Sequence, residues 1–265
     1  MAETLKRPRA SWLLTGSLLA MLCQPVLAEA AERVACEGKY PQHLQGICLD
    51  ETAIFWCFTT QLVKTDRQGK LLRQIPVANH HGDLCLHEGQ LYVAVNLGEF
   101  NQPPGKADSW VYVYQASDLK FLTKHAIPEV VHGAGGLGVR EGRFYVVGGL
   151  PEGVSENFVY EYDSQFRFQK RHVIASGHTD LGIQTATFAG GRWYFGCYGK
   201  PEVLLVTDAD FRLISRTVFP CAYGIAARPD GGLVAADNIR HPNQEHEGLV
   251  FEVVPDPPRG LKRSN

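Results

Sequence analysis

The chain has 265 residues, enough for one domain with a sizeable core, and 45% of them are hydrophobic. The formal net charge of −2 gives no electrostatic case for a nucleic-acid partner, and no basic amphipathic segment indicates binding to a membrane surface. The 27 glycines and the 10% of aromatic residues are typical of a protein built from strands and tight turns.

The N-terminal segment, residues 1–30, has the features of a secretory signal peptide. Lys6, Arg7 and Arg9 form a positive start, an apolar run follows over residues 12–22, and small residues around Ala28 offer a cleavage site. An uncleaved membrane anchor is the alternative, but the apolar run is shorter than the ~20 residues that a span needs. We therefore expect a secreted or periplasmic protein, monomeric and without a membrane span after cleavage.

A short motif recurs five times along the mature chain. Each copy has a polar start, a Gly or Asp, a short apolar strand and a tight turn, and four of the five begin with His. The copies start at His43, His80, His132, His178 and Cys221. Repeats spaced by about 40–50 residues, each with several strands, are typical of the blades of a β-propeller.

The first four repeat units each predict four antiparallel strands. These units cover residues 46–77, 83–127, 135–174 and 182–219. In three units an Asp begins the turn between the third and fourth strands: Asp66, Asp163 and Asp208. A carboxylate at this place bonds the local backbone, so the same turn is expected in all three units.

The fifth unit predicts only three strands, at residues 224–228, 233–238 and 249–254. The proline-rich stretch 255–258 that follows cannot pair as a central strand. The mature N-terminus, Arg33–Cys36, is the remaining strand-like piece, and its pairing with the fifth unit would close the ring and remove a free sheet edge.

The sequence therefore predicts an all-β fold. It is a single β-propeller over residues 31–256, with five blades of four antiparallel strands, followed by a flexible tail at residues 257–265. Six blades is the alternative if the irregular residues 98–109 hide further strands.

The repeat starts resemble those of known propellers. The stretch His43–Ile47 resembles the repeat starts of NHL-type propellers, and Gln45-Gly46-Ile47 is loosely similar to the first blade of the five-bladed secreted glutaminyl cyclases. The resemblance to small β-propellers covers nearly all of the mature chain. The later Glu-Gly-Leu and Trp-Gly-Leu strand starts of the cyclases are absent here, so the resemblance implies the fold rather than that activity.

Propeller geometry places the repeat starts at one mouth of the central channel. The first strand of each blade is innermost, and its start lies at the same face as the end of the antiparallel second strand. Long loops at residues 97–109, 150–156 and 239–247 belong to this face as well. We expect the mouth to bind a small polar or carbohydrate-like ligand through Gln45, Asp83, Asn96, Asp180, Tyr198, Asn238, Arg240 and His241.

The repeated histidines form a candidate metal site at the same mouth. Imidazole is a common ligand of transition metals, and a divalent ion would be held by His43, His81, His132 and His178. One alternative is that these rings serve structure, bonding backbone groups and water in the channel, and another is metal-free acid/base use.

Other motifs are absent or misleading. The glycine-rich stretch Gly133–Gly138 matches the pattern of dinucleotide-binding loops, but a hairpin rather than a helix follows it, so we exclude NAD binding. No nucleophile elbow, zinc-protease motif or phosphate loop occurs. Six cysteines follow residue 30 and permit disulfides in an exported protein.

The leading hypothesis is an exported propeller that binds a small polar ligand at a His-rich mouth. A metal-dependent hydrolase or lyase with axial His ligands is one alternative, and a protein-interaction scaffold is another. The sequence leaves open whether the protein is an enzyme.

Overall fold

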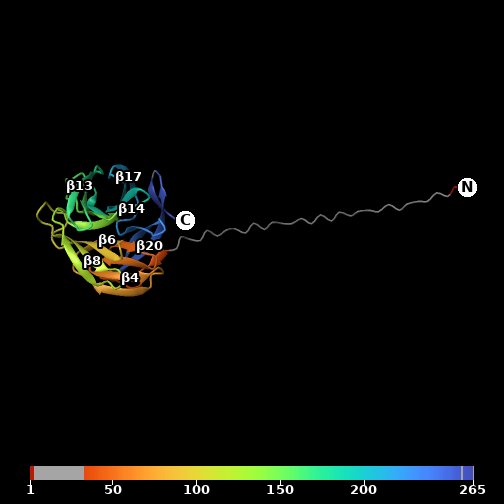
Figure 1. The fold of residues 1–265 in the computed structure, drawn as a ribbon, viewed down its shortest axis with the longest axis horizontal. Helices are drawn as coiled ribbons and strands as arrows, with labels where there is room; N and C mark the ends of the chain where they lie inside the picture. Colours follow the sequence, from red (N-terminus) through yellow and green to blue (C-terminus); the bar gives the residue numbers. More distant parts are fainter. Residues whose placement is uncertain (3–32, 258, 265) are drawn as a thin grey trace.

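Five antiparallel sheets stand in a ring in the computed structural model, which describes residues 1–2, 33–257 and 259–264 (Figure 1). The five-bladed β-propeller predicted from the repeat is confirmed. Nearly all of the predicted signal peptide lies outside the described residues. The described part of the chain has no helix with the length and apolar character of a membrane span.

The first four blades are meanders of four consecutive strands, with the first strand innermost. Blade 1 contains β2 (Leu44–Leu49), β3 (Ala53–Phe58), β4 (Gln61–Asp66) and β5 (Leu71–Pro76). Blade 2 contains β6 (His81–His87), β7 (Gln90–Asn96), β8 (Ser109–Gln115) and β9 (Phe121–Ala126). Blade 3 contains β10 (Ala134–Arg140), β11 (Arg143–Gly148), β12 (Asn157–Tyr162) and β13 (Phe168–Ile174). Blade 4 contains β14 (Asp180–Ala189), β15 (Arg192–Tyr198), β16 (Val203–Asp208) and β17 (Leu213–Val218).

The fifth blade is built from both ends of the chain. Its inner strands are β18 (Ile225–Ala227), β19 (Leu233–Arg240) and β20 (His246–Asp256), and β1 (Arg33–Ala35) is added at the outer edge of β20. Val34 of β1 lies opposite Val250 of β20, which confirms the predicted closure by the N-terminal strand. Figure 1 shows the orange first blade beside the blue C-terminal strands.

The C-terminal tail differs from the expectation of a flexible segment. Residues Gly260–Arg263 form β21, which shares the outer edge of β20 with β1 and places Leu261 opposite Pro255. A proline is tolerated at such an edge although it would break a central strand. The side chain of Leu261 is buried in the core between blades 4 and 5, and this burial holds the tail in place.

Five hydrophobic clusters fill the gaps between neighbouring blades, including the gap between the fifth blade and the first. Consecutive side chains of a strand point to opposite faces, so one strand contributes side chains to the clusters on both sides of its blade. On β3, Trp56 packs toward blade 5 and Phe55 toward blade 2. On β15, Trp193 packs toward blade 3 and Tyr194 toward blade 5. The aromatic strands are thus the core of the ring.

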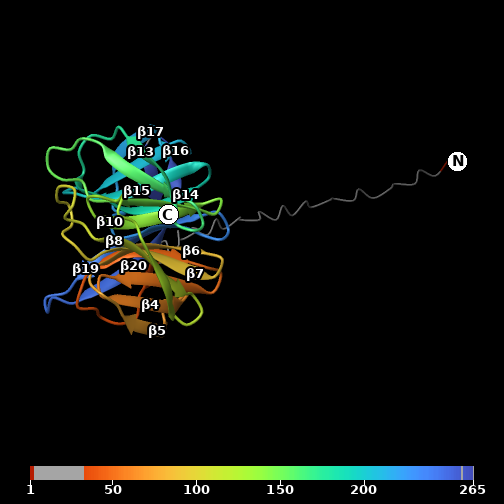
Figure 2. The same ribbon diagram turned by 60° about the vertical axis from the view of Figure 1, so that its left-hand side comes forward.

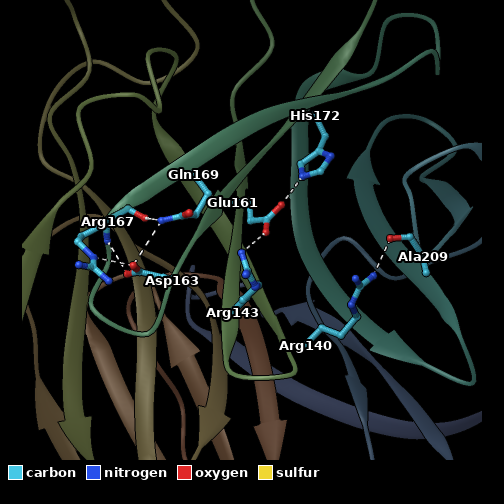
Figure 3. A network of polar contacts seen from close by, with 8 residues as sticks. All are labelled: Arg140, Arg143, Glu161, Asp163, Arg167, Gln169, His172 and Ala209. Atoms are coloured by element: carbon cyan, nitrogen blue, oxygen red, sulfur yellow. Dashed lines mark hydrogen bonds and ion pairs between the residues drawn. The ribbon is translucent and has the colours of Figure 1, made fainter.

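Polar side chains fasten the outer strands of blade 3 (Figure 3). Glu161 accepts hydrogen bonds from Arg143 Nη1 at 2.8 Å and from His172 Nε2 at 2.7 Å. Partial burial raises the pKa of Glu161, but these two partners outweigh it and hold the pKa below its usual value. Arg140 Nη1 donates to the carbonyl oxygen of Ala209 at 2.6 Å and so links blade 3 to blade 4.

All six cysteines between residues 33 and 257 are buried free thiols. The disulfides that the sequence permits are therefore not formed among these six. Burial raises the pKa of Cys36 and that of Cys197 to about 12, which makes both thiols poor nucleophiles. Their role is that of small apolar side chains in the core.

Candidate ligand-binding site

The innermost strands of blades 1 to 4 begin with an irregularity in their pairing. The register between β2 and β3 shifts between Leu44 and Gly46, and comparable shifts occur near the starts of β6, β10 and β14. A β-bulge re-aims the side chain of the extra residue. Gln45 and Gln184, which lie at two of these shifts, line a pocket at the mouth of the channel.

This mouth pocket has a volume of about 510 Å³. Small-molecule sites usually measure about 300–1,000 Å³, so the mouth pocket is large enough for one small ligand. Its walls come from the inner strands, from the loop after β7 and from the hairpin between β19 and β20, which Figure 2 shows on one side of the ring. The lining residues are His43, Gln45, His80, Phe100, Leu181, Gln184, Tyr198, Tyr223, Asn238, Arg240 and His246.

A hydrogen-bonded amide forms the floor of the mouth pocket. Nε2 of Gln45 lies 2.9 Å from Nε2 of His43 and 2.9 Å from Nε2 of His80, and it also contacts Oγ1 of Thr59 at 3.1 Å. The amide nitrogen has two hydrogens for these three neighbours, so it donates to two of them at a time, and an imidazole that accepts on Nε2 carries its proton on Nδ1. Nδ1 of His80 is buried and has no hydrogen-bond partner among the described residues. The hydroxyl of Tyr198 contacts Nε2 of His43 at 3.2 Å, so a phenol joins the same network.

The imidazoles of the mouth pocket are uncharged at neutral pH. Burial lowers the pKa of His43 to about 4, and the neighbouring rings of His80 and His246 add repulsion. Burial also lowers the pKa of His80. The pKa of His246 is lowered by burial and then by the charge of Arg240. The three rings therefore act as neutral hydrogen-bonding groups rather than as a positive cluster.

The upper wall of the mouth pocket combines an amide with aromatic rings. Oδ1 of Asn238 accepts from the backbone N–H of Leu44 at 3.0 Å, and Nδ2 contacts Nδ1 of His246 at 3.0 Å. The contact with Leu44 ties blade 5 to blade 1 at the mouth, and the contact with His246 lies within blade 5. Phe100 stacks on His80 with ring centroids 6.3 Å apart, and the rings of Tyr198 and Tyr223 meet edge to face at 5.6 Å.

Asp83, predicted as a ligand-binding residue, lies in the channel beneath the floor and is fully buried. Oδ2 accepts from the backbone N–H of Ala186 at 3.0 Å, so the side chain crosses from blade 2 to blade 4. Oδ1 is buried and has no hydrogen-bond partner in the described part of the chain. Burial raises the pKa of Asp83 well above its usual value, although backbone N–H groups act in the opposite direction.

Three further predicted ligand-binding residues lie outside the mouth pocket. Asn96 is buried and fastens the following loop, since Oδ1 accepts from the N–H of Asp108 at 2.9 Å. Asp180 is exposed at the start of β14. Nε2 of His241 lies 2.9 Å from the Glu247 carboxylate, away from the lining residues. Of the eight predicted ligand-binding residues, Gln45, Tyr198, Asn238 and Arg240 line the pocket.

The four predicted metal ligands are not gathered at one point. His43 lines the mouth pocket, whereas His81 is fully buried, with Nε2 at 2.8 Å from the Tyr114 hydroxyl. Nδ1 of His132 and Nδ1 of His178 each lie 2.8 Å from a carbonyl oxygen, those of Gln102 and Val154. Within residues 33–257 and 259–264, no three His, Cys, Asp or Glu side chains form a group that could hold a metal ion. Metal binding stays a prediction.

Six lining residues were not among those predicted to bind a ligand or a metal, although the repeat start His80 and the loops that carry Phe100 and His246 were expected at this mouth. The six are His80, Phe100, Leu181, Gln184, Tyr223 and His246. His80 precedes His81, and the choice between two neighbours in a strand depends on the register that the bulge sets. The Gly-rich and Asp-rich starts of the repeats were the available signal for bulges, because Gly inside a strand often marks one.

The fold and the mouth pocket together define a five-bladed β-propeller with a pocket of polar and aromatic side chains at one end of its channel. No family model matches the chain, and no curated protein matches its sequence. The resemblance to NHL-type propellers and to glutaminyl cyclases therefore stays an expectation.

Solved structures with a similar fold include glycoside hydrolases. An engineered GH43 enzyme with endo-xylanase and exo-arabinofuranosidase activity has a TM-score of 0.58 at 11% identity, over 89% of this chain and 54% of that one. A xylan β-1,4-xylosidase from Bacillus halodurans C-125 has a TM-score of 0.59 at 12% identity, over 85% and 55%. A bifunctional GH43-CE protein of Bacteroides eggerthii has a TM-score of 0.56 at 13% identity, over 89% and 36%.

This chain therefore spans about half of the first two proteins and about a third of the last. At these identities the similarity shows the fold alone.

Proposed function

We propose that the protein binds a small polar, carbohydrate-like ligand in the mouth pocket. The observation that carries this proposal is the composition of the lining: three amide side chains, Gln45, Gln184 and Asn238, stand among aromatic rings. An amide both donates and accepts hydrogen bonds, as a sugar hydroxyl does. Aromatic rings such as Phe100 and Tyr223 supply apolar surface for the carbon skeleton.

The lining favours binding over glycoside hydrolysis. Most glycosidases place two carboxyl groups on either side of the bond that is cleaved. The lining of the mouth pocket includes no Asp or Glu, and Asp83 is buried beneath the floor. The names of the similar structures support a carbohydrate ligand, but their reaction would need residues that this pocket does not present.

Neither alternative function has an observation of comparable weight. A metal-dependent hydrolase or lyase would need a ligand set, and no such group is present among the described residues. A scaffold would need one broad apolar face. The exposed apolar side chains of the outer strands, such as Leu72, Phe121, Phe168 and Val218, are instead spread over four blades. Export stays a prediction from the N-terminal sequence.

Calorimetric titration of the protein with monosaccharides tests the proposal. We expect binding, and we expect Gln184→Ala to weaken it by about tenfold, since the loss of one good hydrogen bond is worth roughly 1 kcal/mol or somewhat more. Gln169→Ala is the matched control, because Gln169 is exposed on an outer strand (Figure 3). Failure of every neutral and acidic monosaccharide to bind would overturn the proposal, as would a Gln184→Ala variant that binds like the parent.

A further inference from the structure

The charge in the mouth pocket has one sign. Among the lining residues, Arg240 alone carries a permanent charge, and no lining residue is acidic. The lowered pKa values of His43, His80 and His246 leave these rings neutral near pH 7. A single guanidinium is therefore the one charged group that the lining itself presents to a ligand.

No carboxylate of the described residues compensates this guanidinium. Arg240 donates to the side-chain oxygen of Gln244, which is uncharged, and it forms no ion pair within residues 33–257. The nearby acidic groups have other partners. Asp237 accepts from Arg263 at 2.8 Å, and Glu202 accepts from the backbone N–H groups of Cys221 and Ala222 at 3.0 and 2.9 Å.

Glu247 is also engaged elsewhere. It accepts from Lys39 and lies 2.9 Å from Nε2 of His241. Of the three acidic residues nearest in sequence to Arg240, Asp237 and Glu247 pair with Arg263 and Lys39. The third, Glu245, accepts from Nδ2 of Asn243 and forms no ion pair with Arg240 within residues 33–257. The positive charge of Arg240 stays available to a ligand.

We propose that the ligand of the mouth pocket is an acidic sugar whose carboxylate is bound by Arg240. This inference rests on the proposed function and names its ligand class. The planar guanidinium presents paired N–H donors that match the two oxygens of a carboxylate, and such charge-assisted bonds are about twice as strong as neutral ones. The amide nitrogens of Gln45 and Gln184 bond within the protein, so their side-chain oxygens, which have no hydrogen-bond partner among the described residues, then accept from hydroxyl groups of the same sugar. With a neutral sugar the guanidinium keeps only Gln244 and water as partners.

The test uses matched sugar pairs that differ only at one carbon. Glucose is compared with glucuronate, and galactose with galacturonate, by calorimetry at pH 7.5. We expect at least one uronate to bind about tenfold tighter than its neutral counterpart, and raised salt to weaken the uronate selectively. Arg240→Gln should remove this preference, and Arg240→Lys should retain part of it. Arg73→Gln is the control, because it removes the same charge from an exposed outer strand.

The outcomes separate the two proposals. Equal affinity for the two members of each pair, in both pairs, would overturn the acidic-sugar inference and leave carbohydrate binding intact. A uronate preference that survives in Arg240→Gln would overturn the role of Arg240. Tighter binding of glucose 6-phosphate than of glucuronate would overturn the carboxylate assignment in favour of a phosphate. If no sugar binds, the proposed function fails and the inference fails with it. Arg240 is exposed, so the variants should melt with the parent protein.

Discussion

Acidification should destabilise the fold through two imidazoles that are held neutral. His81 is fully buried, with Nδ1 2.6 Å from the carbonyl oxygen of Ala78 and Nε2 2.8 Å from the hydroxyl of Tyr114. Nδ1 therefore donates and Nε2 accepts. A second proton, on Nε2, would create a positive charge in a buried site and disturb the contact with Tyr114. Burial lowers the pKa of His81 to about 4, and burial lowers that of His43 to about 4 as well.

The sign and size of the effect follow from these values. Because each folded pKa lies below the unfolded value of 6.5, the unfolded chain binds more protons between pH 6.5 and 4. The contribution of these two neutral rings to stability is fully present above pH 6.5 and is lost as the pH falls through this window. Between pH 7.5 and pH 5 each ring lowers the free energy of unfolding by roughly 2 kcal/mol, since one pKa unit corresponds to about 1.36 kcal/mol. Two rings together remove about 4 kcal/mol, a large part of a typical stability of about 5–15 kcal/mol.

Urea unfolding at pH 7.5 and pH 5, followed by tryptophan fluorescence, measures this loss. His81→Gln keeps a donor and an acceptor but cannot take a proton, so the difference in unfolding free energy between the two pH values should shrink by roughly 2 kcal/mol. His43→Gln should shrink it by a similar amount. The reasoning is refuted if either variant keeps the full pH dependence of the parent, or if NMR titration places the His81 pKa near 6.5.

Three further predictions concern closure, the channel and the loop at the mouth. Deleting residues 1–35 removes β1 from the edge of β20 and should lower the melting temperature by several degrees or more; unchanged melting would contradict closure by β1. Burial raises the pKa of Asp83, so the neutral acid stabilises the fold below pH 3.8 and this contribution is lost as the pH rises. The free energy of unfolding of Asp83→Asn, taken relative to that of the parent in urea, should therefore be higher at pH 8 than at pH 4. A relative value that is higher at pH 4 would show that the carboxylate is charged in the fold. Replacing residues 97–108 with a short turn removes Phe100 and should weaken monosaccharide binding while the far-UV circular dichroism stays the same; a general loss of structure would show that this loop supports the fold.

The parts of the structure that were predictable are those decided by local chemistry. The Asp66, Asp163 and Asp208 side chains each accept from backbone N–H groups two and four residues further on, at 2.9–3.0 Å. An aspartate makes these bonds within its own turn, so the sequence is sufficient to place it. The blade count follows from the repeats for the same reason, because every unit carries its own strands and turns.

The site was harder to predict because it depends on register and on distant segments. His80 and His81 are neighbours in sequence, yet His80 lines the mouth pocket and His81 is buried against Tyr114. A bulge shifts the register by one residue and decides which side chain faces the channel. Phe100 lies in the loop at residues 97–109, which was expected at this face, but the loop has no periodic pattern to indicate which of its side chains enters the pocket.

The central claim is that the mouth pocket binds a sugar, and histidine NMR tests it most directly. The imidazole signals of His43, His80 and His246 report on the lining, whereas His125 and His172 lie on outer strands and serve as internal references. On titration with glucose, glucuronate, galactose and galacturonate, we predict saturable shifts of the first three signals and none of the last two. If none of these sugars moves the three lining signals, or if all five signals move together, the account of the mouth pocket is contradicted.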